Sequence, residues 1–121
     1  MVDVDRLVQR FVAVWNEPDA GIRRATIEAL WTAEGRHLMG SQDVQGYDAL
    51  AERVAASHDR SVVQGGNIFR PATAIQTLAD VVKFRWDMAR RSNGEVISAG
   101  VGILKLDPEG RITCDYLFTE F

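Results

Sequence analysis

Hydrophobic residues in the first part of the chain recur with the period of an α-helix. Apolar side chains fall at i, i+3, i+4, i+7, i+10 and i+11, and these are Val4, Leu7, Val8, Phe11, Val14 and Trp15. This spacing places them on one face of an amphipathic helix. The segment Asn16-Glu17-Pro18 ends that helix, because the residue before a proline is pushed out of the α region.

Two more helices and a short strand are predicted next. Asp19 can cap a second helix that runs through Trp31, and Gly35 ends it. Residues 36–39 suffice only for a short strand. Gly46 leads into a third helix, which fades at residues 57–58. Its apolar positions again have helical spacing, and these are Tyr47, Leu50, Ala51 and Val54.

The second half of the chain alternates β-rich runs with turn signals. After a predicted loop over residues 59–66, the β-rich runs cover residues 67–78, 81–90, 96–106 and 112–118. Asn93-Gly94 and Pro108-Glu109-Gly110 are strong turn signals between runs. Three helices followed by an antiparallel meander predict an α+β fold, with the three N-terminal helices packed on the sheet.

The two middle runs predict which way their side chains face. In residues 81–88, aromatic and apolar side chains alternate with charged ones, so the face with Phe84 and Trp86 must meet the helices. In the next run, both faces lack charge. One carries Ser98, Gly100, Gly102 and Leu104. Two glycines on one strand face mark a bend or a close approach, so this face is a candidate pocket floor.

The opposite face of the run 96–106 predicts self-association. It carries Ile97, Ala99, Val101 and Ile103. Such an apolar patch would be exposed to solvent unless another subunit covered it. We therefore expect a homodimer through this sheet face.

Composition narrows the classes of partner and cofactor. A chain of 121 residues with 46% apolar content fits one domain over residues 1–121. Its net charge of −3 is spread along the chain, which argues against a nucleic-acid partner. No run of 18 apolar residues and no signal-like N-terminus occur, so we expect no membrane partner and a cytoplasmic location. We expect no metal, because the chain has one cysteine, Cys114, and two histidines without the spacing of metal ligands. We also expect no nucleotide cofactor, because the chain lacks a phosphate-loop motif.

The order of elements, together with three segments, resembles the nuclear transport factor 2-like (NTF2-like) superfamily, including its SnoaL-like members. The segments are LVQRFVA (7–13), QGYDAL (45–50) and DPEGRI (107–112). The resemblance covers nearly the whole chain and implies a cone-shaped fold, in which helices and a curved antiparallel sheet enclose one small-molecule pocket. Similar members include ketosteroid isomerases, polyketide cyclases, dehydratases, hydrolases and non-catalytic binding domains. One fold hosts many functions, so function depends on the site.

Comparison with ketosteroid isomerases implies that their proton-handling groups are missing. Those enzymes use a helix tyrosine, a strand carboxylate and a protonated acid, and the matching positions here are Phe11, Met39 and Gly102. None of these side chains can move a proton or donate to an enolate. The same comparison places further residues on the cavity side: Phe84, Trp86, Ser98, Gly100, Asp115 and Leu117.

Two polar residues are candidates for catalysis. His37 shares a strand face with Met39, and beside a carboxylate it could act as a general base near neutral pH. The alternative is a histidine at a strand end that is bonded to the backbone. Asp115 would be costly to bury alone, so it is paired, pocket-facing or exposed. A shift of one residue in the last strand would put Cys114 and Tyr116 in the cavity instead.

The sequence therefore predicts a protein that binds an apolar or aromatic small molecule. The predicted ligand-binding residues are Phe11, Trp15, Met39, Phe84, Trp86, Ser98, Gly100 and Leu117, with His37 and Asp115 as polar and catalytic candidates. Aromatic residues at helical spacing also suit plain core packing. The function is either that of a cofactor-independent isomerase, cyclase or dehydratase, or that of a non-catalytic ligand-binding or protein-interaction domain.

Overall fold

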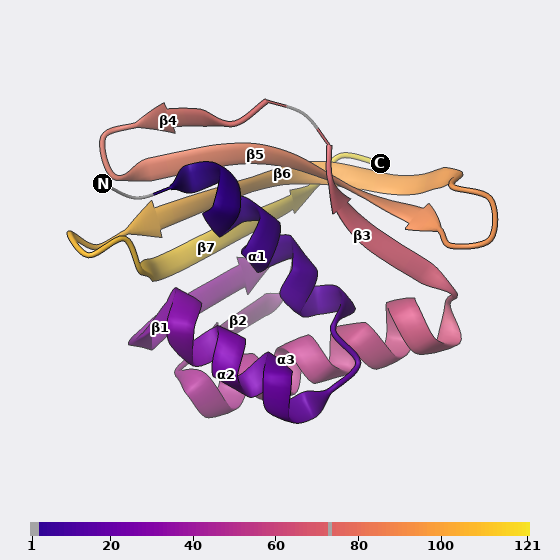
Figure 1. The fold of residues 1–121 in the computed structure, drawn as a ribbon, viewed down its shortest axis with the longest axis horizontal. Helices are drawn as coiled ribbons and strands as arrows, with labels where there is room; N and C mark the ends of the chain where they lie inside the picture. Colours follow the sequence, from indigo (N-terminus) through magenta and orange to yellow (C-terminus); the bar gives the residue numbers. More distant parts are fainter. Residues whose placement is uncertain (1–2, 73) are drawn as a thin grey trace.

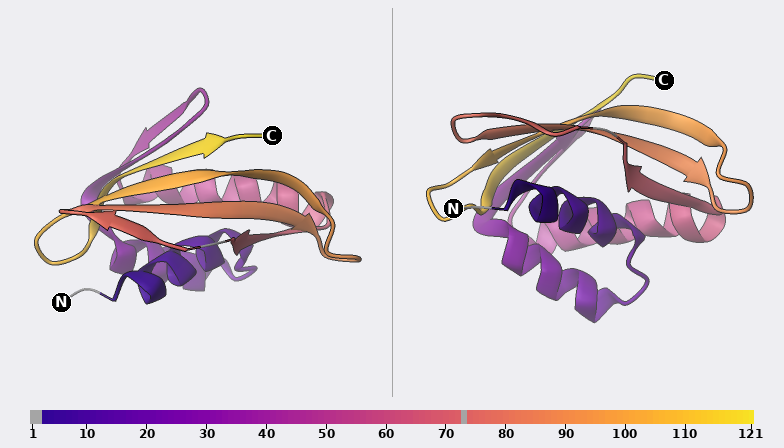
Figure 2. Two further views of the ribbon diagram at one scale, coloured as in Figure 1. Left: turned by 90° about the horizontal axis from the view of Figure 1, so that it is seen from above. Right: turned by 45° about the horizontal axis from the view of Figure 1, so that its top comes forward.

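The computed structural model describes residues 3–72 and 74–121, in which three α-helices cover one face of a seven-stranded sheet (Figures 1 and 2). The helices are α1 (Val4–Asn16), α2 (Ala20–Leu30) and α3 (Tyr47–Ser57). A π-helical segment, η1 (His58–Gln64), continues directly from α3. Within these residues, no helix is both long enough and apolar enough to cross a membrane.

The sheet is mixed and open. Its strands are β1 (Trp31–Met39), β2 (Gln42–Gln45), β3 (Asn67–Pro71), β4 (Gln76–Leu78), β5 (Val81–Arg90), β6 (Val96–Leu106) and β7 (Ile112–Thr119). They lie in the order β2-β1-β7-β6-β5-β3, and β4 also pairs with β5. The neighbours pair antiparallel except β1 and β7, which are parallel. The predicted α+β class is confirmed, with this parallel pair as the departure from a purely antiparallel sheet.

The predicted end of the second helix is wrong. Asp19 caps α2 as expected, since its Oδ1 accepts a hydrogen bond of 2.9 Å from the backbone N–H of Ile22. The helix stops at Leu30, however, and Trp31 begins a strand that continues through Gly35. Trp31 lies opposite Ile112 of β7, so its conformation is set by a strand far away in sequence.

Other differences occur where elements are short. The predicted loop 59–66 is mostly η1, and the predicted run 67–78 is divided into β3 and β4, which both pair with β5. The hairpin partner β2 was not predicted. It returns along β1 after Gly40, which has a positive φ of 58° that glycine adopts easily. By contrast, β5 and β6 have the predicted bounds.

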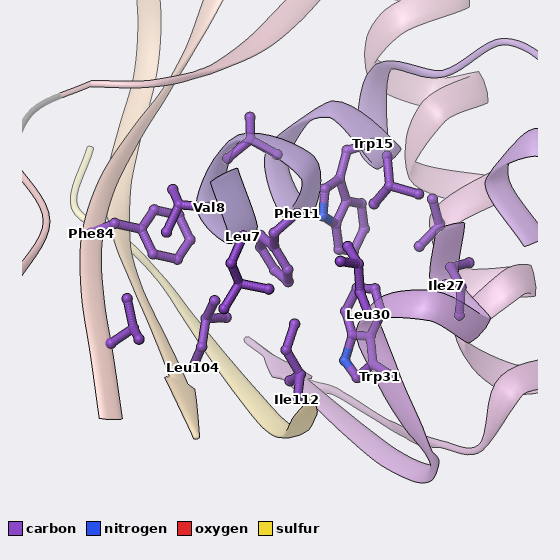
Figure 3. Packing of buried hydrophobic residues seen from close by; sticks show 14 of the residues in the cluster. Leu7, Val8, Phe11, Trp15, Ile27, Leu30, Trp31, Phe84, Leu104 and Ile112 are labelled. Carbon is purple, nitrogen blue, oxygen red and sulfur yellow. The ribbon is translucent and has the colours of Figure 1, made fainter. Parts of the chain in front are cut away.

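The core lies between α1 and the sheet and centres on Phe11. The Phe11 ring centroid is 5.4 Å from that of Trp31, 5.6 Å from that of Phe84 and 6.2 Å from that of Trp15. Figure 3 shows these rings meeting from α1, β1 and β5. Offset and edge-to-face contacts of this kind stabilise beyond the area that they bury. Phe11 is therefore a central packing residue as well as a wall of the site described below.

The two glycines of β6 make room for aromatic side chains and not for a ligand. Gly100 lies opposite Trp86 and Gly102 opposite Phe84 in the β5–β6 pair. A Cβ atom at Gly100 would lie 2.6 Å from Cζ2 of Trp86, and one at Gly102 would overlap the Phe84 ring. Of the two alternatives that the glycines predicted, a close approach is therefore the one observed, because the Trp86 and Phe84 rings of the neighbouring strand contact these two positions.

The sheet face opposite the helices carries the predicted association patch. Val101 lies opposite Arg85, and Phe118 beside it is 55% exposed. Ala99 contributes little, because it is buried and its backbone pairs with residues 120 and 121. Homodimer formation through this face stays a prediction, which light scattering would test.

Candidate functional site

A pocket of about 380 Å³ lies between α1, the α3–η1 segment and the inner face of the sheet. Most residues predicted to bind ligand line it: Phe11, Trp15, Met39, Phe84, Trp86, Ser98 and Leu117. Helical periodicity turns the α1 residues inward, and strand alternation does the same for the others. Their place in the lining agrees with the predicted faces, while their role in binding stays a prediction.

Gly100 is not part of the lining. It lies beneath the Trp86 ring, as described above. Its contribution is therefore indirect, since it lets Trp86 lie close to the sheet. A larger residue at Gly100 would clash with the backbone carbonyl oxygen of Phe118 and with that ring, so it would not simply fill the pocket.

His37 and Asp115 form a buried pair behind the pocket wall. Both side chains are fully buried, and His37 Nδ1 lies 2.6 Å from Asp115 Oδ1. Trp31 donates from Nε1 to the other carboxylate oxygen over 3.0 Å. The parallel register of β1 and β7 sets His37 opposite Asp115, while Tyr116 points outward and is 36% exposed. The possible one-residue shift is thereby excluded, and His37 bonds a carboxylate and not the backbone.

Neither member of this pair lines the pocket. Trp15 lies between the pair and the pocket: it lines the pocket, and its ring centroid is 5.2 Å from that of His37. His37 Nε2 is buried without a hydrogen-bond partner among the described residues. The two predicted catalytic residues thus contact each other, but neither is placed to contact a molecule in the pocket directly.

Burial dominates the electrostatics of Asp115. Loss of solvation raises the pKa of this carboxyl, while the hydrogen bonds from His37 and Trp31 act in the opposite direction. The indole N–H can only donate, so Oδ2 of Asp115 serves as its acceptor in either protonation state. The arrangement holds the His37 ring in a fixed orientation.

Sequence reasoning missed the polar residues of the α3–η1 segment. Arg53, Ser57, Arg60 and Ser61 all line the pocket. Their spacing of i, i+4, i+7 and i+8 is a helical stripe, and this signal could have identified them had the helix been extended beyond Ser57. The Arg53 guanidinium carbon lies 5.9 Å from the Trp15 ring centroid, and Nη2 lies 3.9 Å from Met39 Sδ.

The pKa of the Arg53 guanidinium is lowered, first by burial and then by the positive charge of Arg60. Asp115 acts in the opposite direction but more weakly. Neither arginine forms an ion pair with a carboxylate of the described residues, unlike Arg24, Arg36 and Arg70. In the described part of the chain, no cluster of three or more His, Cys, Asp or Glu side chains is arranged to hold a metal ion.

Comparisons with solved structures agree on one fold. A candidate isomerase of the SnoaL-like family from Agrobacterium tumefaciens superposes with a TM-score of 0.85, at 22% identity over 96% of both chains. A candidate polyketide cyclase from Sinorhizobium meliloti has a TM-score of 0.71, at 13% identity over 97% of this chain and 99% of that one. An NTF2-like protein of unknown function from an Exiguobacterium species has a TM-score of 0.68, at 19% identity over 94% and 98%.

No protein-family model and no curated protein sequence gives a significant match to the chain. At these low identities, the structural likeness establishes the fold alone, and the function must be argued from the site. The arrangement of helices on one face of a curved open sheet is shared with these solved structures. The chain has the NTF2-like fold that its sequence resemblance predicted.

Proposed function

We propose that this protein binds a small molecule with an apolar, ring-containing body in the pocket beside α1. The volume of about 380 Å³ lies in the lower part of the range of small-molecule sites, which is about 300–1,000 Å³. The lining combines aromatic rings with a few polar groups. Sites with this composition use the rings for affinity and the polar groups for orientation.

One observation carries the proposal: apolar side chains that pack against the core remain partly exposed where they face the pocket. These residues are Met39, Phe69, Met88 and Leu117. Each Å² of apolar surface left in water forgoes about 25 cal/mol of stabilisation. An apolar ligand would bury this surface without any change in the fold.

Catalysis as a cofactor-independent isomerase, cyclase or dehydratase is the second candidate. It is favoured by the short His37–Asp115 contact and by the unpartnered Nε2 of His37. A general base must come within about 2.6–3.2 Å of the proton that it removes, directly or through one water. Because His37 does not line the pocket, we favour ligand binding over catalysis as the function. NMR signals of the His37 ring that stay unchanged when a pocket ligand saturates would argue against the catalytic role.

The test of binding uses N-phenyl-1-naphthylamine, a neutral dye that fluoresces in apolar surroundings. We expect saturable binding of one dye per chain and a higher melting temperature, since a ligand at 100 times its Kd adds about 2.7 kcal/mol of stability. Leu117→Trp should fill the pocket and abolish binding. Phe118→Trp is the matched control, because Phe118 is the next residue on β7 and is exposed on the opposite face.

Circular dichroism must show that both variants are folded. Dye binding that is absent from the wild type, or that survives Leu117→Trp as well as it survives Phe118→Trp, would contradict the proposal. Loss of binding in Leu117→Trp alone would support it.

A further inference from the structure

The pocket contains more unpaired hydrogen-bond donors than acceptors. Three buried N–H groups of lining residues have no acceptor among the described residues: Nε1 of Trp15, Nε1 of Trp86 and Nε of Arg53. The only unpaired buried side-chain acceptor among the described lining residues is Oδ1 of Asn67. A buried donor without a partner costs about 1–3 kcal/mol. These three N–H groups are shielded from solvent, so a ligand acceptor would reach them only after a shift of the surrounding side chains.

The pocket is also positively charged in a protein that is negative overall. The lining residues within the described ranges include Arg53 and Arg60 and no Asp or Glu, whereas the whole chain has a net charge of −3. The pKa of Arg53 is lowered first by burial and then by the positive charge of Arg60, so the two arginines repel each other. A negative group placed between them would relieve this repulsion and would accept their hydrogen bonds.

The two arginines differ in how they are held. Arg53 is half-buried, with its guanidinium near the Trp15 ring and the Met39 sulfur. Arg60 is exposed and lines the pocket from η1, further along the same helical stripe. The hydroxyl groups of Ser57 and Ser61 lie on the same stripe and can donate to the same anion. Arg53 is thus the inner contact and Arg60 the outer one.

We propose that the ligand is an organic carboxylate, whose apolar body lies against the aromatic rings and whose carboxylate is bound by Arg53 and Arg60. This inference rests on the proposed binding function and adds the chemical class of the ligand. The planar guanidinium matches a carboxylate with two parallel hydrogen bonds. His37 and Asp115, expected from the sequence to be the main polar groups for the ligand, are replaced in that role by the arginines.

The test compares two molecules that differ in charge and share one shape. 2-Naphthoate and its neutral amide, 2-naphthamide, are titrated against the protein by calorimetry. We expect the wild type to bind the carboxylate about tenfold more tightly, which is about 1.4 kcal/mol. Arg53→Met should remove that preference and leave amide binding within about twofold, since methionine preserves the apolar stem. Arg60→Met should lower the preference about threefold, because an exposed charge is screened by solvent.

Arg6→Met is the matched control, since Arg6 is exposed at the start of α1, does not line the pocket and carries the same charge. It should bind both molecules as the wild type does. Should Arg53→Met not fold, Arg60→Met decides the question, because its side chain lies at the surface.

The outcomes separate the two proposals. Equal binding of amide and carboxylate by the wild type would overturn the carboxylate inference and leave the binding function standing. Equal losses for both molecules in Arg53→Met and Arg60→Met would do the same. Binding of neither molecule, together with absence of dye binding, would remove both proposals. A preference for the carboxylate that Arg6→Met also loses would reflect overall charge and would contradict a role of the pocket arginines.

Discussion

The two ends of the inner sheet face are built from the same three strands, yet one is closed and the other open. At the closed end, Val82, Leu104 and Ile112 are buried in the core cluster. At the open end of β5, β6 and β7, Met88, Ser98 and Thr119 line the pocket. Strand alternation points the side chains inward at both ends, so the strands alone do not explain the difference.

The difference lies in what faces the sheet. Leu7 and Val8 of α1 cover the closed end, as Figure 3 shows beside Leu104. The open end faces the polar stripe of the α3–η1 segment, which begins with Arg53 and Ser57. At the closed end, apolar side chains of α1 pack directly on the sheet. At the open end, burying the polar side chains of the α3–η1 segment against Met88 would cost free energy, so the space between them stays open. The pocket is thus specified by the helix and not by the sheet.

The buried cluster of Trp31, His37 and Asp115 marks the boundary between the two ends. Asp115 lies opposite Leu104 of the closed end and two residues before Leu117 of the pocket. All three cluster residues are fully buried. A carboxyl group survives this burial only because its two oxygens both have hydrogen-bond partners.

The largest expected effect comes from breaking this boundary. Asp115→Ala leaves the Trp31 N–H and the His37 ring buried without partners, and we expect it to cost about 3–5 kcal/mol of unfolding free energy. Urea unfolding followed by tryptophan fluorescence measures the loss. Asp43→Ala is the control, because Asp43 pairs with Arg36 at the surface, 2.7 Å away, and its removal should barely change the midpoint. A variant at Asp115 as stable as the wild type would show that the cluster contributes nothing.

Equal truncations at the two ends should have unequal effects. Leu104→Ala removes a fully buried side chain and should cost about 2–5 kcal/mol. Leu117→Ala removes a half-buried pocket residue and should cost less than about 1 kcal/mol, because the site is already open. Dye affinity should fall in Leu117→Ala. The same loss of stability in both variants would break the distinction between a closed and an open end.

The smallest expected effect is a dependence on pH. Burial raises the folded pKa of Asp115, while in the unfolded chain the pKa is about 3.9. The folded state then binds more protons in the window above about pH 4, so the contribution of Asp115 is present below the unfolded pKa and is lost as pH rises through the folded one.

The measurement compares the wild type with Asp115→Asn, which cannot titrate. The stability of the wild type relative to this variant should fall between about pH 4 and pH 7, by about 1.4 kcal/mol per unit of pKa difference that lies in this window. A relative gain in stability over the same range would mean that His37 and Trp31 hold Asp115 ionised, and that their hydrogen bonds outweigh its burial.

The sequence alone determined the elements whose patterns are long and regular. The spacing from Val4 to Trp15 predicted α1, and the alternation and turn signals predicted the bounds of β5 and β6. These patterns are local, since each residue's side is set by the period of its own element. The face carrying Phe84 and Trp86 was predicted for the same reason, and the structure places both in the pocket lining.

Only the tertiary structure decided which of these faces meet and what lies between them. Trp31 is a strand residue because β7 pairs with it, and His37 meets Asp115 across 78 positions of sequence. The Trp86 ring of the neighbouring strand occupies the space above Gly100. Arg60 lines the pocket because α3 continues into η1. Such contacts depend on the packing of several elements at once, and no local period encodes them.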